Sequence, residues 1–279
     1  YAETKIQELN AELEDRVVER TAQLEFANKE MEAFAYSVSH DLRAPLRAME
    51  GFSVALLNQY SDKLDEQGQH YLNRIQVASE RMGQLISDLL DLSRINRKEL
   101  TPQQVNLSAL ALEIADELKM LDLQRQVEFI ITDAIIAQGD AGLLRIVLQN
   151  LLANAWKFTS SRPKTIIEIG EMTTAEFLKK NTNSETFSRD GLTDFFASQE
   201  SNPQSKVYYV RDNGVGFNME FSSKLFSPFQ RLHAMHEFPG TGIGLAITQR
   251  VISRHRGFIW PEAQEGKGAI FYFTLGGRK

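Results

Sequence analysis

Apolar side chains recur at alternating intervals of four and three residues in the first part of the chain. The positions are Leu13, Val17, Leu24, Ala27, Met31, Phe34 and Val38, with Arg20 as a polar interruption. This spacing is typical of a two-stranded coiled coil. Residues 1–36 contain no Gly or Pro, which favours one long helix. Ile6 and Leu9 lie on a shifted seam, which indicates a local stutter.

We therefore predict a parallel coiled coil over residues 1–36. The alternative is a single amphipathic helix packed on a domain. So narrow an apolar stripe buries too little area to hold one helix by itself, which favours the coiled coil.

The apolar seam continues past residue 36, so the first helix should reach about Gln59. A turn is expected at Tyr60–Gly68, followed by a second amphipathic helix. Its apolar stripe comprises Leu72, Ile75, Ala78, Met82, Leu85, Leu89, Leu92 and Ile95. Two helices with one stripe each cannot enclose a core, whereas two hairpins related by a twofold axis form a four-helix bundle. We predict a homodimer, with residues 37–99 as the dimerisation domain.

Thr101 and Pro102 end the helical pattern, and alternating helices and strands follow. The helices are expected at Ser108–Leu121, Gly142–Phe158 and Gly242–Arg254. The strands are expected at Val127–Thr132, Thr165–Ile169, Val207–Asp212, Phe258–Glu262 and Ala269–Leu275. This order predicts a two-layer α/β sandwich over residues 102–279, with helices on one face of a mixed sheet. The fold class is thus α followed by α/β.

Length and composition limit the number of domains, the kinds of partner and the cellular compartment that we expect for the protein. A length of 279 residues suits two domains, and a net charge of −6 argues against a broad nucleic-acid surface. No apolar run is long enough for a membrane segment. The absence of cysteine favours the cytosol. The chain opens on a helical pattern at Tyr1 without Met or a signal peptide, so we expect a fragment whose upstream sensor domain is missing.

His40 on the first helix is a candidate phosphate acceptor. An imidazole can attack phosphorus through one ring nitrogen while the other keeps its proton, and Asp41 could stabilise the developing charge. Pro45 removes a helix hydrogen bond to the carbonyl of Asp41, so a locally strained turn is expected there. Taken alone, a His-Asp pair is more often a surface feature than a catalytic one.

Asn150, Asn154 and Lys157 follow at intervals of four and three, which places them on one helix face. An amide oxygen beside phosphate oxygens suits Mg²⁺, and the lysine could bind phosphate. The alternative is a solvent-facing polar stripe on an amphipathic helix.

Two glycine-rich segments follow. Asp212 ends a strand before Gly214 and Gly216; its carboxylate could accept a hydrogen bond from an exocyclic amine, and the glycines would let the backbone approach a flat base. A hairpin turn is the alternative. The segment containing Gly240, Gly242 and Gly244 leads into a helix whose first amides could bind phosphate. It fits neither a Walker loop nor a dinucleotide fingerprint.

The order of these motifs, with Phe226-x-x-Phe229 and a final Gly266-x-Gly268, resembles that of sensor histidine kinases. HDLRAPL, FQRL and GTGIGLAI are similar to the phytochrome-type subgroup. The resemblance covers residues 13 to 275. It implies a dimerisation and histidine phosphotransfer domain followed by a gyrase-type ATP-binding domain, with ATP and Mg²⁺ as cofactors. It also implies phosphotransfer from His40 to an aspartate of a response regulator receiver domain.

The resemblance further implies individual roles. His40 would be the phosphoacceptor and Asp41 its base; Asn154 would bind Mg²⁺, with Asn150 and Lys157 on phosphate or metal. Asp212 would read the adenine amine in a pocket shaped by Gly214 and Gly216. Residues 217–239 would form a lid anchored by Phe226 and Phe229, and the phosphates would lie at the segment of Gly240, Gly242, Gly244 and Leu245.

Three departures from the family pattern carry predictions. Ala44 replaces the usual Thr or Asn that orients a water, so we predict weak phosphatase activity. Ala269 and Ile270 replace hydroxyl residues near the base, which should leave ATP binding intact. An insertion at about 171–205 separates two strands. It is either a docking surface or a tolerated insertion folded on the sheet edge, with short helices expected at Thr173–Lys180 and Thr193–Ser198.

Two other functions remain as alternatives at this point. One is a dimeric nucleotide-binding adaptor that has lost catalysis, and the other is a stand-alone ATPase of the gyrase or chaperone type. The acceptor hairpin argues against the second. The sequence does not define the input signal, the response regulator, or whether phosphate moves within or between protomers.

Overall fold

The computed structural model describes residues 2–95, 99–180, 205–232, 237–238 and 240–276. The chain divides into two units, residues 1–96 and 97–279. None of the described helices combines the length and the apolar character needed to cross a bilayer. The short helix predicted at Thr193–Ser198 lies outside the described residues.

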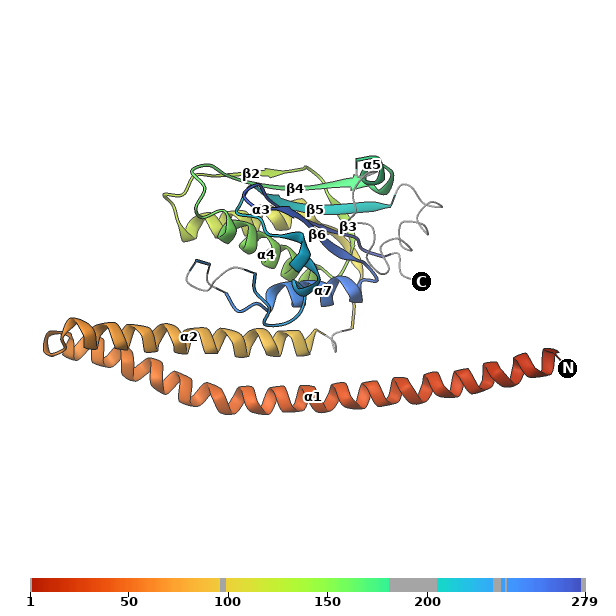
Figure 1. The fold of residues 1–279 in the computed structure, drawn as a ribbon, viewed down its shortest axis with the longest axis horizontal. Helices are drawn as coiled ribbons and strands as arrows, with labels where there is room; N and C mark the ends of the chain where they lie inside the picture. Colours follow the sequence, from red (N-terminus) through yellow and green to blue (C-terminus); the bar gives the residue numbers. More distant parts are fainter. Residues whose placement is uncertain (1, 96–98, 181–204, 233–236, 239, 277–279) are drawn as a thin grey trace. The chain divides into compact units, whose positions relative to one another are not determined.

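The first unit is a helical hairpin (Figure 1). Helix α1, Ala2–Tyr60, continues through Pro45, and Ser61–Lys63 form one turn of 3₁₀ helix before α2, Glu66–Arg94. The second helix begins earlier than predicted, because the Asp65 carboxylate accepts the Gly68 amide at 2.7 Å and caps its first turn. The strained turn expected near Pro45 is not a break in the helix, since α1 is continuous there.

Few of the apolar side chains that the structure describes in the hairpin are buried. Its core cluster consists of Leu46, Ile86 and Leu90. Large apolar side chains on both helices stay exposed in the single chain, among them Phe52, Ile75, Val77 and Met82. In the predicted coiled-coil seam Leu13 is 60% exposed and Val17 is 55% exposed.

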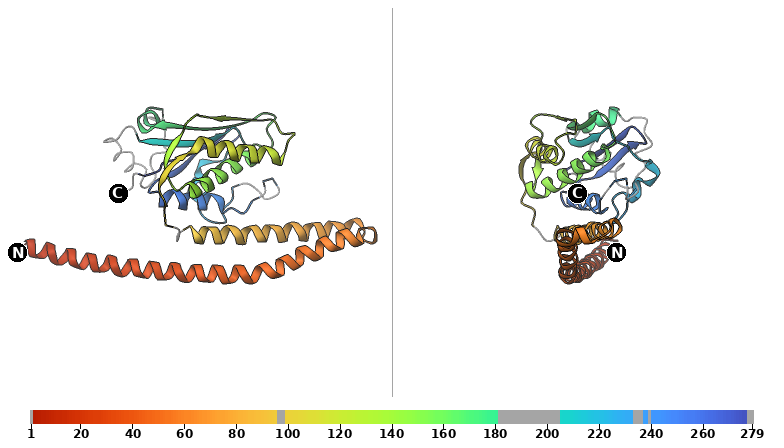
Figure 2. Two further views of the ribbon diagram at one scale, coloured as in Figure 1. Left: turned by 180° about the vertical axis from the view of Figure 1, so that it is seen from behind. Right: turned by 90° about the vertical axis from the view of Figure 1, so that its left-hand side faces the viewer.

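The second unit is a two-layer α/β sandwich, as predicted (Figures 1 and 2). A five-stranded mixed sheet has the order β2-β4-β5-β7-β6. The strands are β2 Val127–Ile131, β4 Thr165–Thr173, β5 Lys206–Asp212, β6 Ile259–Gln264 and β7 Gly268–Phe273. Helices α3, Leu107–Leu121, α4, Ala141–Phe158, and α7, Gly244–Arg254, lie over one face. Only β2 and β4 pair in parallel.

A second, two-stranded sheet was not predicted. It pairs β1, Gln103–Asn106, antiparallel to β3, Ile136–Gly139. Both strands are only four residues long, so their alternation is too short to separate from loop in the sequence. The pairing places the start of the second unit beside the strand that leads into α4.

One polar network fixes the start of α4 to the end of α7. Asp140 caps α4 by accepting the Leu143 amide at 3.0 Å, and its second carboxylate oxygen accepts the Thr101 hydroxyl at 2.9 Å. The Asp140 amide donates to Nε2 of His255 at 3.0 Å. The two helices that carry the candidate site are thereby held together at their far ends.

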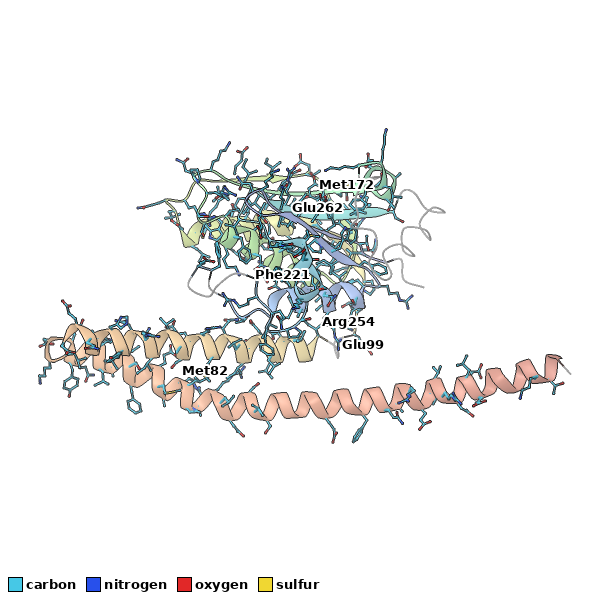
Figure 3. The ribbon with its side chains drawn as sticks, viewed as in Figure 1. Met82, Glu99, Met172, Phe221, Arg254 and Glu262 are labelled. Atoms are coloured by element: carbon cyan, nitrogen blue, oxygen red, sulfur yellow. The ribbon has the colours of Figure 1, made fainter. Side chains whose placement is uncertain are left out.

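Part of the predicted insertion forms a helix on the other face of the sheet. Helix α5, Thr174–Lys180, begins with a capping box in which Thr173 and Glu176 exchange hydrogen bonds. Phe177 is 3% exposed and packs on Val207, Trp260 and Tyr272. These residues alternate along their strands with residues of the helix-covered core, so α5 covers the opposite face. Figure 3 shows the side chains on this scaffold.

Candidate active site

The predicted site residues of the second unit come from α4, the end of β5 and the glycine segment before α7. Asp212 ends β5, where its side chain is 7% exposed. Its carboxylate accepts the Gly214 amide at 2.8 Å. Burial raises the pKa of Asp212 to about 6, although the amides of Gly214 and Ala269 and the charge of Arg162 act in the opposite direction. A buried carboxylate of this kind is suited to accept a hydrogen bond from a ligand amine.

The loop after β5 is fastened to its neighbours by the asparagine that follows Asp212. Asn213 accepts the Ile166 amide and donates to the Lys164 carbonyl, each at 2.9 Å. The Val215 amide donates to the Phe158 carbonyl at 3.1 Å, which joins the loop to the end of α4. The Asp212 carboxylate is therefore held by a rigid loop.

The glycines of this loop make close backbone contacts that the sequence did not predict, and their expected role beside a flat base stays a prediction. A Cβ on Gly214 would lie 2.5 Å from the Phe158 carbonyl oxygen, and one on Gly216 would lie 2.0 Å from that of Gln264. Gly216 also has a φ of 62°. It is thus close approach of the protein's own backbone that requires glycine at both positions.

The face of α4 that carries Asn150 and Lys157 meets the glycine segment. A Cβ on Gly244 would lie 2.8 Å from Oδ1 of Asn150, and one on Gly240 would lie 3.2 Å from Nζ of Lys157. Asn154 lies one helical turn beyond Asn150 on the same face and is half-buried. The α4 face and the glycine segment thus form two sides of one site.

Helix α7 begins at Gly244, two residues later than predicted, because Gly240 and Gly242 have positive φ angles of 152° and 78°. The side chain of its N-cap residue, Ile243, makes no capping hydrogen bond, and the Ile243 amide donates to the Thr241 hydroxyl at 3.4 Å. The half-buried Leu245 is its second residue. A helix N-terminus whose N-cap side chain makes no capping hydrogen bond presents amides and the positive end of the helix dipole to an anion.

The cation of the site is Lys157. Burial, with the charge of Arg231 as a second cause, lowers the pKa of Lys157 to about 8. Within the part of the chain that the structure describes, Lys157 has no carboxylate partner, and its Nζ lies 4.2 Å from the centroid of the Phe158 ring. A partly buried ammonium without a counter-charge favours a bound anion.

The two phenylalanines of the predicted lid differ. Phe226 is buried, as an apolar anchor should be, but the Phe229 ring is 58% exposed. Phe229 has a φ of 65°, which turns its ring outward, and its amide donates to the Gly242 carbonyl at 3.0 Å. The anchoring role expected for the Phe229 side chain is therefore wrong, and its backbone makes the contact.

Arg231 is a site residue that the sequence reasoning missed. Its guanidinium donates to the Gly240 carbonyl at 2.6 Å and to the Phe238 carbonyl. It thereby holds the glycine segment and places a second positive charge near Lys157. The sequence signal was the arginine of FQRL, to which no role had been assigned.

In the first unit, Asp41 is exposed on α1. The side chain of His40 lies outside what the structure describes, so the predicted His40 and Asp41 contact stays a prediction. Among the described residues, no group of three or more His, Cys, Asp or Glu side chains could hold a metal ion.

Comparison with known proteins defines the class. Residues 30–98 match the His Kinase A (phospho-acceptor) domain. Residues 139–278 match the Histidine kinase-, DNA gyrase B-, and HSP90-like ATPase family. The chain belongs to this ATPase family, and within it to the sensor histidine kinases.

Individual relatives agree with that assignment. Cyanobacterial phytochrome B of Nostoc sp. is 32% identical over 94% of this chain and 31% of its own length. Methanogenesis regulatory histidine kinase FilI of Methanothrix harundinacea is 32% identical over 92% of this chain and 26% of its own length. The chain spans about a third of the length of the curated relatives it matches first.

The fold is also that of a solved structure, full-length ShkA in complex with AMPPNP. The likeness has a TM-score of 0.56 at 20% identity, and covers 87% of this chain and 46% of that one. The domain boundaries at residues 36, 99 and 102 stay predictions.

Proposed function

We propose that this chain phosphorylates His40 with ATP and then passes the phosphoryl group to an aspartate of a response regulator. The observation that carries the proposal is the meeting of three groups in one unit. These are the buried Asp212 carboxylate, the N-terminus of α7, and the Lys157 ammonium, which has no carboxylate partner among the described residues. Together they offer an acceptor for a base amine and a positive site for phosphates.

In this mechanism Asp212 accepts a hydrogen bond from the adenine amine. Lys157 and the first amides of α7 bind the phosphates, and Arg231 holds the glycine segment in place for them. Asn154 would hold Mg²⁺ through its amide oxygen, with Asn150 beside it. When bound, the ion neutralises phosphate charge and leaves positioning to the protein.

The transfer itself needs positioning more than covalent chemistry. One ring nitrogen of His40 forms the new bond to the γ-phosphorus, and the bond from that phosphorus to the β-γ bridging oxygen breaks. ADP leaves with the bond's electron pair. Asp41 stabilises the positive charge that develops on the imidazole. In the second step a receiver aspartate oxygen takes the phosphoryl group and the imidazole is regenerated.

The active form is proposed to be a homodimer. The hairpin core of Leu46, Ile86 and Leu90 is small, and apolar side chains on both helices remain exposed in one chain. A second hairpin would cover them as a four-helix bundle. Light scattering at several protein concentrations tests the dimer, and a monomer at every concentration would exclude it.

The central test is labelling of the purified chain with ATP carrying a radioactive γ-phosphate. We expect an acid-labile, base-stable label that His40→Gln abolishes. His70→Gln is the matched control, because His70 is an exposed histidine on the other helix of the hairpin. Label that survives His40→Gln would exclude His40 as the acceptor. ATP binding without any label on the wild type would favour the adaptor function.

Mixing two inactive variants tests the route of transfer. Asp212→Asn protomers should lack nucleotide binding, and His40→Gln protomers should lack the acceptor. Label on the mixture would show that the phosphoryl group moves between protomers. An unlabelled mixture, in which exchange of subunits has been verified, would show transfer within one protomer.

A further inference from the structure

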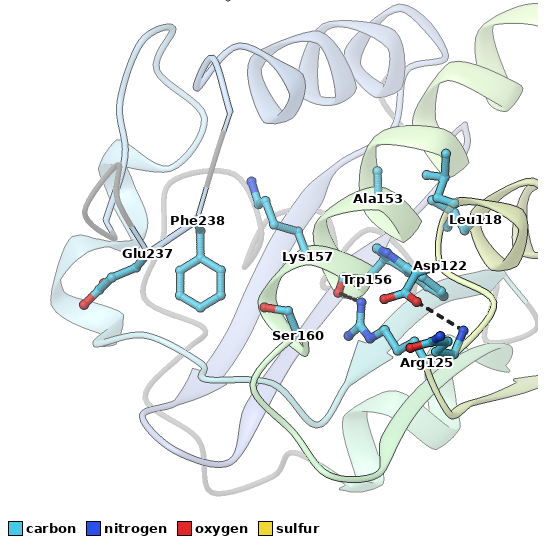
Figure 4. Close-up of a pocket in the computed structure, with 11 residues that line it drawn as sticks. Leu118, Asp122, Arg125, Ala153, Trp156, Lys157, Ser160, Glu237 and Phe238 are labelled. Atoms are coloured by element: carbon cyan, nitrogen blue, oxygen red, sulfur yellow. Dashed lines mark hydrogen bonds between the residues drawn. The ribbon is translucent and has the colours of Figure 1, made fainter. Parts of the chain in front are cut away.

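A cavity of about 630 Å³ opens between α3, α4 and the segment of Glu237 and Phe238 (Figure 4). Its apolar wall includes Leu118, Trp156 and Phe238. Of the proposed nucleotide residues in the described chain, only Lys157 lines it. The cavity is therefore a separate space that shares one cation with the nucleotide site.

The aromatic wall of this cavity is rigidly held. The Arg125 guanidinium lies 4.4 Å from the Trp156 ring centroid and donates to the Trp156 carbonyl at 2.6 Å. It also donates to the Thr159 hydroxyl at 2.7 Å. On the sheet side, the Phe129 ring stacks on Trp156 with centroids 6.3 Å apart. The indole is thus fixed in place before any ligand binds, which lowers the entropic cost of binding.

The polar lining of the cavity comprises Asp122, Gln124, Arg125, Lys157, Ser160 and Glu237, and the proposed ligand contact among them is the Lys157 ammonium. In Figure 4 this side chain extends between Phe238 and Ala153. It has no carboxylate partner among the described residues, and burial lowers its pKa. A volume of several hundred Å³ with an apolar wall and a small number of polar and charged groups is typical of a small-molecule site.

We propose that this cavity binds a small amphipathic anion, with a planar or aliphatic body on Trp156, Leu118 and Phe238 and a carboxylate, sulfonate or phosphate on Lys157. Since the proposed function assigns the same ammonium to the nucleotide, the anion and Mg-ATP compete for it. That part of the inference rests on the proposed function. The cavity is then a site at which a metabolite of this chemistry lowers kinase activity.

The test uses 8-anilino-1-naphthalenesulfonate as the probe and the complete chain, with the probe excited directly. We expect saturable fluorescence enhancement from one site. Ala153→Trp fills the cavity and should abolish the fluorescence enhancement. Ser160→Trp is a second cavity-filling variant, to be used if the first does not fold. Met120→Trp is the matched control, because Met120 is exposed on α3 and does not line the cavity. Lys157→Met should raise the Kd of the probe about 10-fold to 100-fold, because a charged hydrogen bond to the probe is lost.

Competition is measured in the same titration. The apparent Kd of the probe should rise in proportion to the Mg-ATP concentration, while Ala153→Trp keeps ATP binding in equilibrium dialysis and keeps label on His40. Wild-type probe binding in both filling variants overturns the inference. A probe affinity that Mg-ATP leaves unchanged, although dialysis shows that ATP is bound, overturns it as well. Absence of ATP binding in the dialysis counts against the proposed function alone, because the tryptophan variants report the cavity without nucleotide.

Discussion

Asp212 should make the ATPase unit less stable as pH rises. Its pKa is about 6 in the folded protein and 3.8 for the exposed side chain, and the largest cause is burial. The folded state therefore binds more protons than the unfolded state between these values. The stability that this carboxyl contributes is fully present below pH 3.8 and is lost as pH rises through 6. Keeping the group ionised above pH 6 costs about 3 kcal/mol.

Asp212→Asn removes this cost and nearly preserves the shape, and the amide oxygen can still accept the Gly214 amide. The variant should therefore be more stable than wild type. We expect the difference between their free energies of unfolding to be about 2 kcal/mol larger at pH 8 than at pH 4.5. The same variant should lose labelling by ATP, because its amide nitrogen opposes the base amine. Stability and activity are thus expected to change in opposite directions.

Tryptophan fluorescence during urea unfolding measures this difference for one unit. The chain has 2 tryptophans, Trp156 and Trp260, and both lie in residues 97–279. Asp133→Asn is the matched control, because Asp133 is an exposed aspartate of the same unit. A stability gap between Asp212→Asn and wild type that stays constant from pH 4.5 to 8, or shrinks as pH rises, would refute the reasoning.

Three further predictions follow from the site and its support. The Kd of ATP should rise about tenfold for each pH unit below 6, where Asp212 is protonated, and again above pH 8, where Lys157 loses its proton. Calorimetric titration at several pH values measures both rises in the Kd of ATP. Lys157→Met should abolish the rise above pH 8. A rise above pH 8 that persists in this variant would contradict the assignment to Lys157. Phe177→Ala should destabilise the ATPase unit by about 3 kcal/mol in urea unfolding, since it removes a buried ring, and an unchanged midpoint would show that α5 adds nothing. The natural Ala44 should leave the chain without strong phosphatase activity, and rapid dephosphorylation of the phosphorylated regulator on adding the chain would show the opposite.

Much of the fold followed from periodicity. The helical hairpin and the strand and helix order of the second unit were predicted because amphipathic patterns are local properties of the sequence. The face shared by Asn150, Asn154 and Lys157 followed from helical spacing in the same way. The two-stranded sheet at residues 103–139 was missed, since short strands have no distinctive local pattern.

The site residues that the sequence missed or misread depend on contacts between distant segments. Arg231 acquires its role by reaching the carbonyls of Gly240 and Phe238, and Phe229 turns outward at a positive φ. Neither feature is visible in residue type. The position of α5 over the sheet likewise follows from Phe177 packing on strands that are far along the chain.

By itself the sequence determined which residue types were present at helical and strand spacing, and hence the domain order and the family. Only the tertiary structure decided that Asp212 is buried enough to raise its pKa, and that Lys157 lacks a counter-charge among the described residues. The physical reason is that burial and charge pairing are set by neighbours from other elements, whereas helical spacing is set by the chain itself.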